Sequence, residues 1–258
     1  MKIDPIVEIL IDAEVNRKEI FKISNDVPEL NTENAYDVQH RLVEKKLEEG
    51  KSVVGMKMGL TSRAKMEQMG IKEPLYGHLF DYMRVENDGH VSMSELIHPK
   101  VESEIAFIFK DDLCGAGLSD AVIAEAIAYA IPVMEIVDSR YENFNFTLPD
   151  VIADNCSSSR FIVGNPVSSV AGLAYEKMHV TLSINNELAD EGYGSAVLGH
   201  PFASVRELAS MLNKRGLCIK KGDIVLTGGI TKAIAIKAGD LVFTSIEGLG
   251  DVRFEVKA

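Results

Sequence analysis

The sequence of 258 residues predicts an α+β protein, in which a helical N-terminal leader precedes a larger part rich in β-strands. In residues 1–51, apolar side chains recur at helical spacing. From residue 52 onwards they gather instead in short β-rich runs bounded by glycine, proline or charged residues. We therefore divide the chain into a leader, residues 1–51, and a main domain, residues 52–258, which is long enough to bury a core.

Two helices are expected in the leader. Asp4 and Pro5 supply the N-cap and the first helical position of one helix. The other covers residues 32–49, where apolar residues recur every three or four positions and Gly50 closes the helix. The leader is thus expected to be built from helices alone.

The main domain is expected to combine strands with two further helices. An Ala/Ile-rich helix over residues 119–130 ends at Pro132, and another helix opens with a capping box at Ser204 and ends at Gly216. Asn185–Asn186 predicts the turn of a hairpin. Strands are expected at residues 53–58, 101–109, 133–137 and 161–163. After Gly216 the pattern predicts a meander with strands at residues 224–227, 233–237, 241–246 and 252–256.

Composition and charge narrow the class of protein. Hydrophobic residues make up 46% of the chain and charged residues 26%, which is ordinary for a globular protein and excludes collagen-like and disordered chains. The net charge of −12 would be repelled by a phosphate backbone or an anionic membrane surface, so neither nucleic acid nor a membrane is an expected partner. Acidic residues interrupt the first apolar stretch, which argues against a signal peptide and favours a cytoplasmic location.

The chain has three cysteines, Cys114, Cys156 and Cys218. They form neither a CxxC pair nor the dense framework of a disulfide-rich domain. We expect all three to be reduced thiols in a cytosol.

The most informative residues are three glutamates. Glu102 and Glu104 alternate along an expected strand, so they share one face with Cα atoms about 7 Å apart, and their repulsion costs roughly 2 kcal/mol at an effective dielectric of about 20. Glu135 lies in an apolar run, where an unpaired charge is costly. Three carboxylates without a nearby histidine or cysteine favour Mg²⁺ or Mn²⁺. The alternative is that Glu102 and Glu104 line a solvated face while Glu135 pairs with an arginine.

Other segments each have a functional and a structural interpretation. Lys57 lies in an apolar segment and either acts in a site or merely extends its ammonium group to solvent. Residues 154–160 suit a carboxylate ligand or a self-capped turn, and residues 227–231 suit an anion nest or a hairpin turn. Residues 138–140 offer a charge partner to a substrate or to the buried glutamate nearby. His200 is either an acid/base group or, as we favour, a structural histidine.

Taken together, these segments resemble the hydratase/decarboxylase branch of the fumarylacetoacetate hydrolase superfamily, and the resemblance covers essentially the whole chain. The matching segments are residues 55–62 (GMKMGLTS), 64–70 (AKMEQMG), 74–77 (PLYG), 99–106 (PKVESEIA), 136–144 (IVDSRYENF), 153–155 (ADN), 197–201 (VLGHP) and 227–231 (TGGIT).

The resemblance implies a mixed β-barrel or sheet core and a single Mg²⁺ or Mn²⁺ ion held by Glu102, Glu104 and Glu135. Lys57 matches the active-site lysine of the family. Segments that line the family's pocket supply the expected substrate-binding residues, which are Thr61, Asp138, Arg140, Ser158 and Thr231.

The implied activity is metal-dependent decarboxylation of a small dicarboxylic 2-oxo acid, 2-oxohex-3-enedioate, to 2-hydroxypenta-2,4-dienoate and CO₂ in catechol meta-cleavage. The motifs favour a decarboxylase over the sister hydratases, which often carry an acid before the position of Met83, where this chain has Tyr82 after Asp81. Two alternatives stay open: hydration of 2-hydroxypenta-2,4-dienoate, and a non-catalytic 2-oxo-acid-binding partner subunit. A homo-oligomer and an association with the sister hydratase are the expected assemblies.

Overall fold

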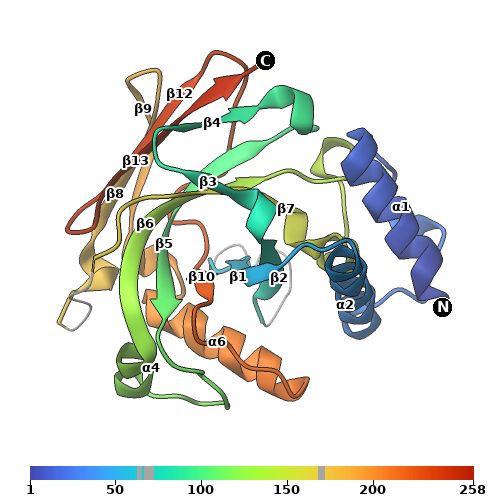
Figure 1. The fold of residues 1–258 in the computed structure, drawn as a ribbon, viewed down its shortest axis with the longest axis horizontal. Helices are drawn as coiled ribbons and strands as arrows, with labels where there is room; N and C mark the ends of the chain where they lie inside the picture. Colours follow the sequence, from blue (N-terminus) through green and yellow to red (C-terminus); the bar gives the residue numbers. More distant parts are fainter. Residues whose placement is uncertain (63–65, 67–72, 168–171) are drawn as a thin grey trace.

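The computed structural model describes residues 1–62, 66, 73–167 and 172–258. The expected motif at residues 64–70 therefore lies outside the described residues, except for Met66. Two mixed sheets form the body of the protein, and the N-terminal helices stand at the side opposite the smaller sheet (Figure 1).

The leader contains the two expected helices, α1 (Ile3–Asn16) and α2 (Thr32–Glu48). The α1 helix begins before Asp4, so this residue lies in the first turn and is not the N-cap that we predicted. Asn31 caps α2, because its side chain accepts hydrogen bonds from the backbone N–H groups of Glu33 and Asn34. Gly50 follows α2 with φ +82°, a left-handed conformation that glycine adopts without strain.

The larger sheet has the strand order β2-β1-β10-β5-β6-β7-β3, with β11 paired to β5. The β1–β10 and β3–β7 pairs are parallel and the other pairs are antiparallel. The bounds of these strands are β1 Val53–Gly59, β2 Leu75–Phe80, β3 Arg84–Glu86, β5 Lys100–Phe109, β6 Ile127–Val137, β7 Ser158–Val163, β10 Ile224–Leu226 and β11 Ile234–Ala235.

The smaller sheet has the order β4-β13-β12-β8-β9. Its strands are β4 Gly89–Ser92, β8 His179–Ile184, β9 Glu187–Tyr193, β12 Leu241–Ile246 and β13 Gly250–Lys257. One buried cluster joins the two sheets, in which Val101, Met134 and Ile136 of the larger sheet meet Val242 and Phe254 of the smaller. The expected α+β sheet core is thus confirmed, although among the described strands neither sheet closes into a barrel.

The predicted hairpin is confirmed and the predicted meander is wrong in part. Asn185 and Asn186 have φ +55° and +66° in the turn between β8 and β9, as a two-residue hairpin turn requires. The strands β12 and β13 pair in sequence, but β10 joins β1 and β5, and β11 also joins β5. Local turn signals do not reveal these long-range partners, because pairing depends on the burial of both strand faces.

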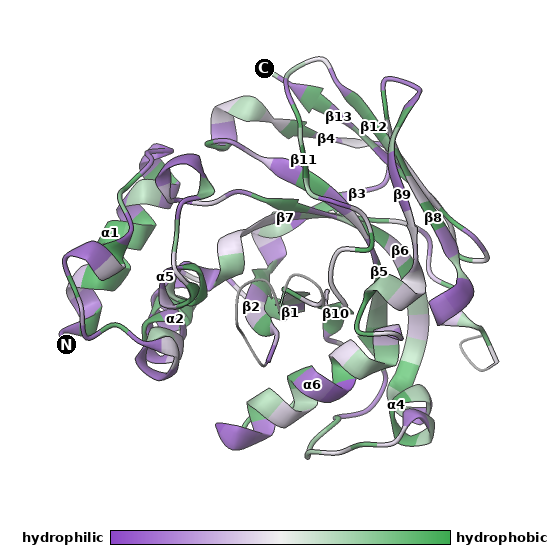
Figure 2. Cartoon of the chain, turned by 180° about the vertical axis from the view of Figure 1, so that it is seen from behind, coloured by the Kyte–Doolittle hydropathy of each residue, from purple (hydrophilic) through white to green (hydrophobic). Residues whose placement is uncertain are grey.

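In the part of the chain that the structure describes, three further α-helices have full bounds: α4 (Asp120–Ala126), α5 (Leu148–Ala153) and α6 (Pro201–Lys214). The helix predicted over residues 119–130 is therefore too long, since the chain enters β6 at Ile127 and Pro132 lies inside that strand opposite Ile105. Long antiparallel pairing with β5 outweighs the helical propensity of the alanine-rich stretch. In Figure 2, α5 lies beside α2, on which it packs.

The predicted capping box at Ser204 is also wrong. His200 caps α6, because its Nδ1 atom accepts a hydrogen bond of 3.0 Å from the backbone N–H of Phe202. Ser204 lies inside the helix, where its hydroxyl donates to the carbonyl of Thr227 at 2.6 Å. The structural interpretation of His200 therefore fits its position.

The expectation of three reduced cysteines is wrong. Cys114 and Cys218 form a disulfide across a sequence separation of 104 residues, and Cys156 is a buried free thiol. The neighbouring Leu113 and Ile219 form an antiparallel bridge, which brings the two sulfur-bearing residues together. Spacing along the chain cannot show this pairing, since it depends on the contact between two distant loops.

The leader shares its core with the sheets. Ile6 and Leu10 of α1 and Val38 of α2 belong to the same buried cluster as Met56 and Phe107. The division between residues 51 and 52 stays a prediction. Within the described ranges, no helix combines the length and the apolar character that crossing a membrane would require.

His78 on β2 gives a prediction for the pH dependence of stability. Burial, and secondarily the charge of His40, lowers the pKa of His78 from 6.5 to about 4. The unfolded chain therefore binds a proton on this histidine more readily than the folded chain does. The contribution of neutral His78 to the free energy of unfolding is fully present above pH 6.5 and is lost as the pH falls towards 4. Between pH 7 and pH 4, we expect the unfolding free energy of the native chain to fall by about 3 kcal/mol more than that of His78→Gln. Parallel urea titrations of both proteins measure this difference, and equal pH slopes would contradict it.

Candidate active site

Three carboxylates converge where β5 pairs with β6. Glu102 lies directly opposite Glu135 in the register, and Glu104 follows on the same face of β5. One carboxylate oxygen from each of the three residues lies within 4.8 Å of the others. The convergence predicted from alternate spacing is therefore present, and the register adds the third group.

The surroundings of these carboxylates oppose their charges. Glu104 and Glu135 are buried, and Glu102 is half-buried. Burial, followed by repulsion from Glu135 and Glu102, raises the pKa of Glu104 well above its ordinary value. Burial also raises the pKa of Glu135, although the nearby Lys57 ammonium acts in the opposite direction. A cation at this position would relieve both the repulsion and the cost of burial.

The oxygen atoms that remain without a partner fit a hard divalent cation. Oε1 of Glu104 and Oε1 of Glu135 are buried, and neither has a hydrogen-bond partner in the described part of the chain. Carboxylate oxygens are the ligands that Mg²⁺ and Mn²⁺ prefer in proteins. In the ionised state, three carboxylates and the Lys57 ammonium leave a formal charge of −2, which one divalent ion would balance.

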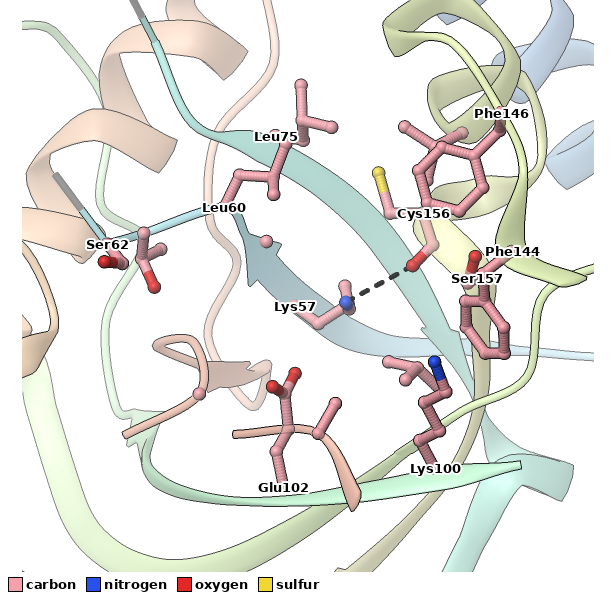
Figure 3. A pocket seen from close by; sticks show the side chains of 16 residues that line it. Lys57, Leu60, Ser62, Leu75, Lys100, Glu102, Phe144, Phe146, Cys156 and Ser157 are labelled. Atoms are coloured by element: carbon pink, nitrogen blue, oxygen red, sulfur yellow. Dashed lines mark hydrogen bonds between the residues drawn. The ribbon is translucent and has the colours of Figure 1, made fainter. Parts of the chain in front are cut away.

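Lys57 extends from β1 to the edge of the carboxylate cluster. Its Nζ lies 3.1 Å from Oε2 of Glu135 and donates a hydrogen bond of 3.3 Å to the carbonyl oxygen of Cys156 (Figure 3). Burial alone would lower the pKa of Lys57. The adjacent carboxylates outweigh this effect, with the largest contribution from Glu135, and raise the pKa above its ordinary value. The side chain is thus an ammonium group held inside the site, and it does not reach solvent.

The glycine turn at residues 227–231 holds one of the carboxylates. The backbone N–H of Gly228 donates to Oε2 of Glu104 at 2.7 Å, so the anion in this turn belongs to the protein itself. Gly228 has φ +112°, and a Cβ atom there would lie 2.1 Å from Oγ1 of Thr61. A Cβ atom on Gly229 would lie 2.2 Å from Oε2 of Glu102. Residue 228 therefore requires glycine, and a side chain at residue 229 would displace the carboxylate of Glu102.

A left-handed turn forms the opposite wall. Asn155, Cys156 and Ser157 follow one another with φ +48°, +53° and +57°, a conformation that costs about 1 kcal/mol or more per non-glycine residue. Asn155 stabilises the turn by exchanging two hydrogen bonds with the backbone of His78, at 2.7 and 2.9 Å. The turn directs the Cys156 carbonyl towards Lys57 and places Ser157 on the cavity wall.

These elements enclose a cavity of about 210 Å³ (Figure 3). Its polar groups come from the ends of β1 and β5 and from the left-handed turn, and its apolar wall is aromatic and aliphatic. The lining consists of Lys57, Gly59, Leu60, Thr61, Ser62, Leu75, Lys100, Glu102, Val137, Phe144, Phe146, Val151, Cys156, Ser157, Gly229 and Ala233.

The substrate-binding residues expected from the family are only partly brought together. Thr61 lines the cavity, as predicted. Thr231 is buried and is not among the lining residues, and its Oγ1 accepts a hydrogen bond of 3.0 Å from the backbone N–H of Ser103. Ser158 lines a different cavity, whereas its neighbour Ser157 lines this one. The hydroxyl groups of both serines are buried and have no hydrogen-bond partner among the described residues. The contact of Ser158 with the substrate stays a prediction, and within the serine run the structure places Ser157 on this cavity.

The structure does not bring Asp138 and Arg140 into the cavity. The carboxylate of Asp138 accepts hydrogen bonds from the backbone N–H groups of residues 97 and 98, at 2.9 and 2.8 Å. The guanidinium of Arg140 pairs with Asp154 and donates to the carbonyls of Asp138 and Ser158, at 2.8 and 3.1 Å. Both side chains line a separate cavity of about 110 Å³, so their expected contact with the substrate is not supported.

Among the lining residues that the sequence-based site did not include are Lys100, Phe144, Phe146 and Ser157. A signal for Lys100 was present, since it continues the alternation of Glu102 and Glu104 by one step. The two phenylalanines come from the segment between β6 and α5, whose position no local pattern predicts.

The fold and the carboxylate cluster together define a class of proteins that bind a divalent metal on a mixed sheet. The sequence profile described as fumarylacetoacetate (FAA) hydrolase C-terminal matches residues 62–257, so the chain belongs to the fumarylacetoacetate hydrolase family.

Within this family, the chain is similar to enzymes of two activities. It is 44% identical to a 4-oxalocrotonate decarboxylase of Pseudomonas putida, over 96% of this chain and 94% of that protein. It is 33% identical to a 2-keto-4-pentenoate hydratase of Paraburkholderia xenovorans (strain LB400), over 96% and 93% of the two chains. The solved structure of 4-oxalocrotonate decarboxylase from Pseudomonas putida G7, complexed with magnesium and adipate, matches with a TM-score of 0.95 and 42% identity, covering 99% of this chain and 98% of that one.

The carboxylate cluster predicts how Glu104→Gln behaves. Loss of one charged ligand should weaken Mn²⁺ binding by more than about 100-fold, because removal of mere outer-shell partners already costs 10- to 100-fold in metal sites. The metal-free variant should melt no lower than the native protein, since the substitution removes a buried, repelled charge. Titration calorimetry with Mn²⁺ and thermal melts check the two effects. Unchanged Mn²⁺ affinity would rule out Glu104 as a ligand.

Proposed function

We propose that this chain is a metal-dependent carboxy-lyase that converts 2-oxohex-3-enedioate (4-oxalocrotonate) to 2-hydroxypenta-2,4-dienoate and CO₂. The observation that carries the proposal is the convergence of Glu102, Glu104 and Glu135 beside the Lys57 ammonium, in a chain 44% identical to a named 4-oxalocrotonate decarboxylase. The metal is Mg²⁺ or Mn²⁺, and a solved relative is complexed with magnesium.

The three glutamates would hold the ion, which would act as a Lewis acid on the 2-keto group of the substrate when bound. The ion pair with Glu135 favours the ammonium form of Lys57, which would stabilise negative charge that develops on the substrate and could donate a proton within the cavity. The backbone N–H of Gly228 fixes one oxygen of Glu104 and so orients the carboxylate cluster.

The apolar wall favours loss of CO₂. In 2-oxohex-3-enedioate, the C3=C4 double bond conjugates the keto group to C5, which bears the C6 carboxylate. The pair of electrons released when the C5–C6 bond breaks can therefore reach the keto oxygen. Phe144, Phe146 and Leu75 replace water around the substrate, and a less polar environment favours a neutral product over a solvated carboxylate.

Hydration of 2-hydroxypenta-2,4-dienoate is the second candidate, because hydratases of the family are about one-third identical to this chain. At the position where hydratases often carry an acid, the hydroxyl of Tyr82 donates to Glu14 at 3.0 Å, and Asp81 is exposed. Among the described residues that line the cavity, Glu102 is the only acid, and it belongs to the metal cluster. This arrangement favours the decarboxylase. The complete set of glutamates with Lys57 likewise argues against a non-catalytic binding subunit.

We also propose a homo-oligomer, an association with the sister hydratase and a cytoplasmic location. Disulfides are unusual in a reducing compartment such as the cytoplasm. Labelling of free thiols in intact cells would show whether Cys114 and Cys218 are oxidised there, and so checks the proposed location. Sedimentation of the chain alone and with the hydratase measures the two assemblies.

Turnover distinguishes the candidate activities. With 2-oxohex-3-enedioate and Mg²⁺, we expect CO₂ release in step with the rise of dienoate absorbance, and no activity after chelation of the metal. Simultaneous manometry and ultraviolet spectroscopy check this result. In a parallel assay, 2-hydroxypenta-2,4-dienoate is supplied as the substrate. Consumption of this dienoate without CO₂ release from 2-oxohex-3-enedioate would identify a hydratase, and no turnover of either compound would identify a binding subunit.

Lys57→Met tests the role of the ammonium group. We expect kcat to fall on the order of 100-fold or more, because proton transfer and charge stabilisation by a positioned group are lost. Substrate binding to the Mg²⁺-loaded variant should be retained, as fluorescence or calorimetric titration would show. A variant with native kcat would exclude Lys57 from the reaction.

A further inference from the structure

Lys100 extends the pattern of the carboxylate cluster along β5. Lys100, Glu102 and Glu104 occupy alternate positions, so their side chains share one face of the strand. In the register, Lys100 lies opposite Val137, two residues beyond the Glu102–Glu135 pair. The lysine lines the same cavity as Lys57, and its nitrogen is directed into that cavity in Figure 3.

The ammonium group of Lys100 is held in place without a carboxylate. Its Nζ lies 3.9 Å from the centre of the Phe144 ring, and the ring of His98 also stacks on Phe144 at 4.6 Å. Within the described residues, no acidic side chain forms an ion pair with Lys100, whereas Lys57 is paired with Glu135. A positioned cation that lacks an anionic partner, on the wall of a cavity, suits an anionic ligand group.

The other predicted cation is not available for this task. All the hydrogen bonds that the structure assigns to the guanidinium of Arg140 are directed to Asp154, Asp138 and Ser158, outside the cavity. Lys57 and Lys100 are thus the two cationic side chains of the described lining.

We propose that Lys100 is the residue that selects dicarboxylic substrates, by binding the carboxylate at the end remote from the 2-oxo group. The inference rests on the proposed function, in which the 2-oxo acid end of the substrate faces the carboxylate cluster. Alternate residues on a strand are about 7 Å apart. With carbon–carbon bonds of about 1.5 Å, an extended six-carbon diacid separates its two carboxyl carbons by about 6 Å. The step from Glu102 to Lys100 therefore matches the length of the substrate.

This role affects affinity more than the rate of the chemical step. The remote carboxylate is charged in the bound substrate and leaves as neutral CO₂, so an ion pair with Lys100 stabilises the ground state at least as much as the transition state. The cation–π contact with Phe144 keeps the ammonium beside the aromatic wall. Lys100 is thus expected to lower KM for the diacid and to leave kcat nearly unchanged.

The test compares two unreactive ligands that differ only in the remote carboxylate, 2-oxoadipate and 2-oxohexanoate. Neither has the double bond that conjugates the keto group to the departing carboxylate. Calorimetry on the Mg²⁺-loaded protein should show that Lys100→Met weakens 2-oxoadipate binding at least about tenfold and leaves 2-oxohexanoate binding within about twofold. Lys100→Arg should keep most of the preference. The exposed Lys110, which directly follows β5, supplies the control variant Lys110→Met, which should resemble the native protein.

Two results would overturn the proposal. Unchanged 2-oxoadipate affinity in Lys100→Met would show that the lysine does not meet the remote carboxylate. An equal loss for both ligands would show that Lys100 only supports the cavity wall. Turnover supplies a second readout, since KM for 2-oxohex-3-enedioate should rise about tenfold while kcat stays within about threefold. A native chain that selects 2-oxoadipate through Lys100 but releases no CO₂ would refute the proposed activity and leave this inference standing.

Discussion

The structure of the site depends on one cross-strand contact, the pairing of Glu102 with Glu135 between β5 and β6. Two carboxylates directly opposite each other destabilise a sheet, and Glu104 adds a third charge nearby. The Lys57 ammonium and the Gly228 N–H offset part of this cost, and the remaining charge of the ionised cluster matches a divalent cation. The cost of the unliganded cluster and its affinity for a metal thus have the same electrostatic origin.

The surrounding backbone is shaped to permit this contact. The glycine turn approaches Thr61 so closely that no side chain fits at residue 228, and a side chain at residue 229 would displace the carboxylate of Glu102. The left-handed turn at Asn155–Ser157 carries conformational strain, and its hydrogen bonds with His78 keep it in place. Strain and close approach therefore occur on two sides of the same cavity, where they position a carbonyl against Lys57 and an N–H group against Glu104.

Local patterns predicted much of the fold and the centre of the site. The helices of the leader, the β8–β9 hairpin and the strand that carries Glu102 and Glu104 follow from periodicity and turn residues. The predicted end of the helix at residue 130 was wrong, because the residues from Ile127 onwards pair with β5 and form strand β6. The path of the chain between β6 and β7 places Ser158, Asp138 and Arg140 on a cavity other than the one beside the carboxylate cluster.

The sequence by itself determined which chemical groups are available. Alternating acids on a strand and a glutamate in an apolar run favour a metal site, and these features depend on spacings of a few residues. Only the tertiary structure decided which groups meet. The opposition of Glu135 to Glu102, the placement of Lys57, Lys100 and Ser157 on one cavity, and the Cys114–Cys218 disulfide all join distant segments. Such contacts follow from strand order and register, which the burial of the whole chain fixes and no short stretch encodes.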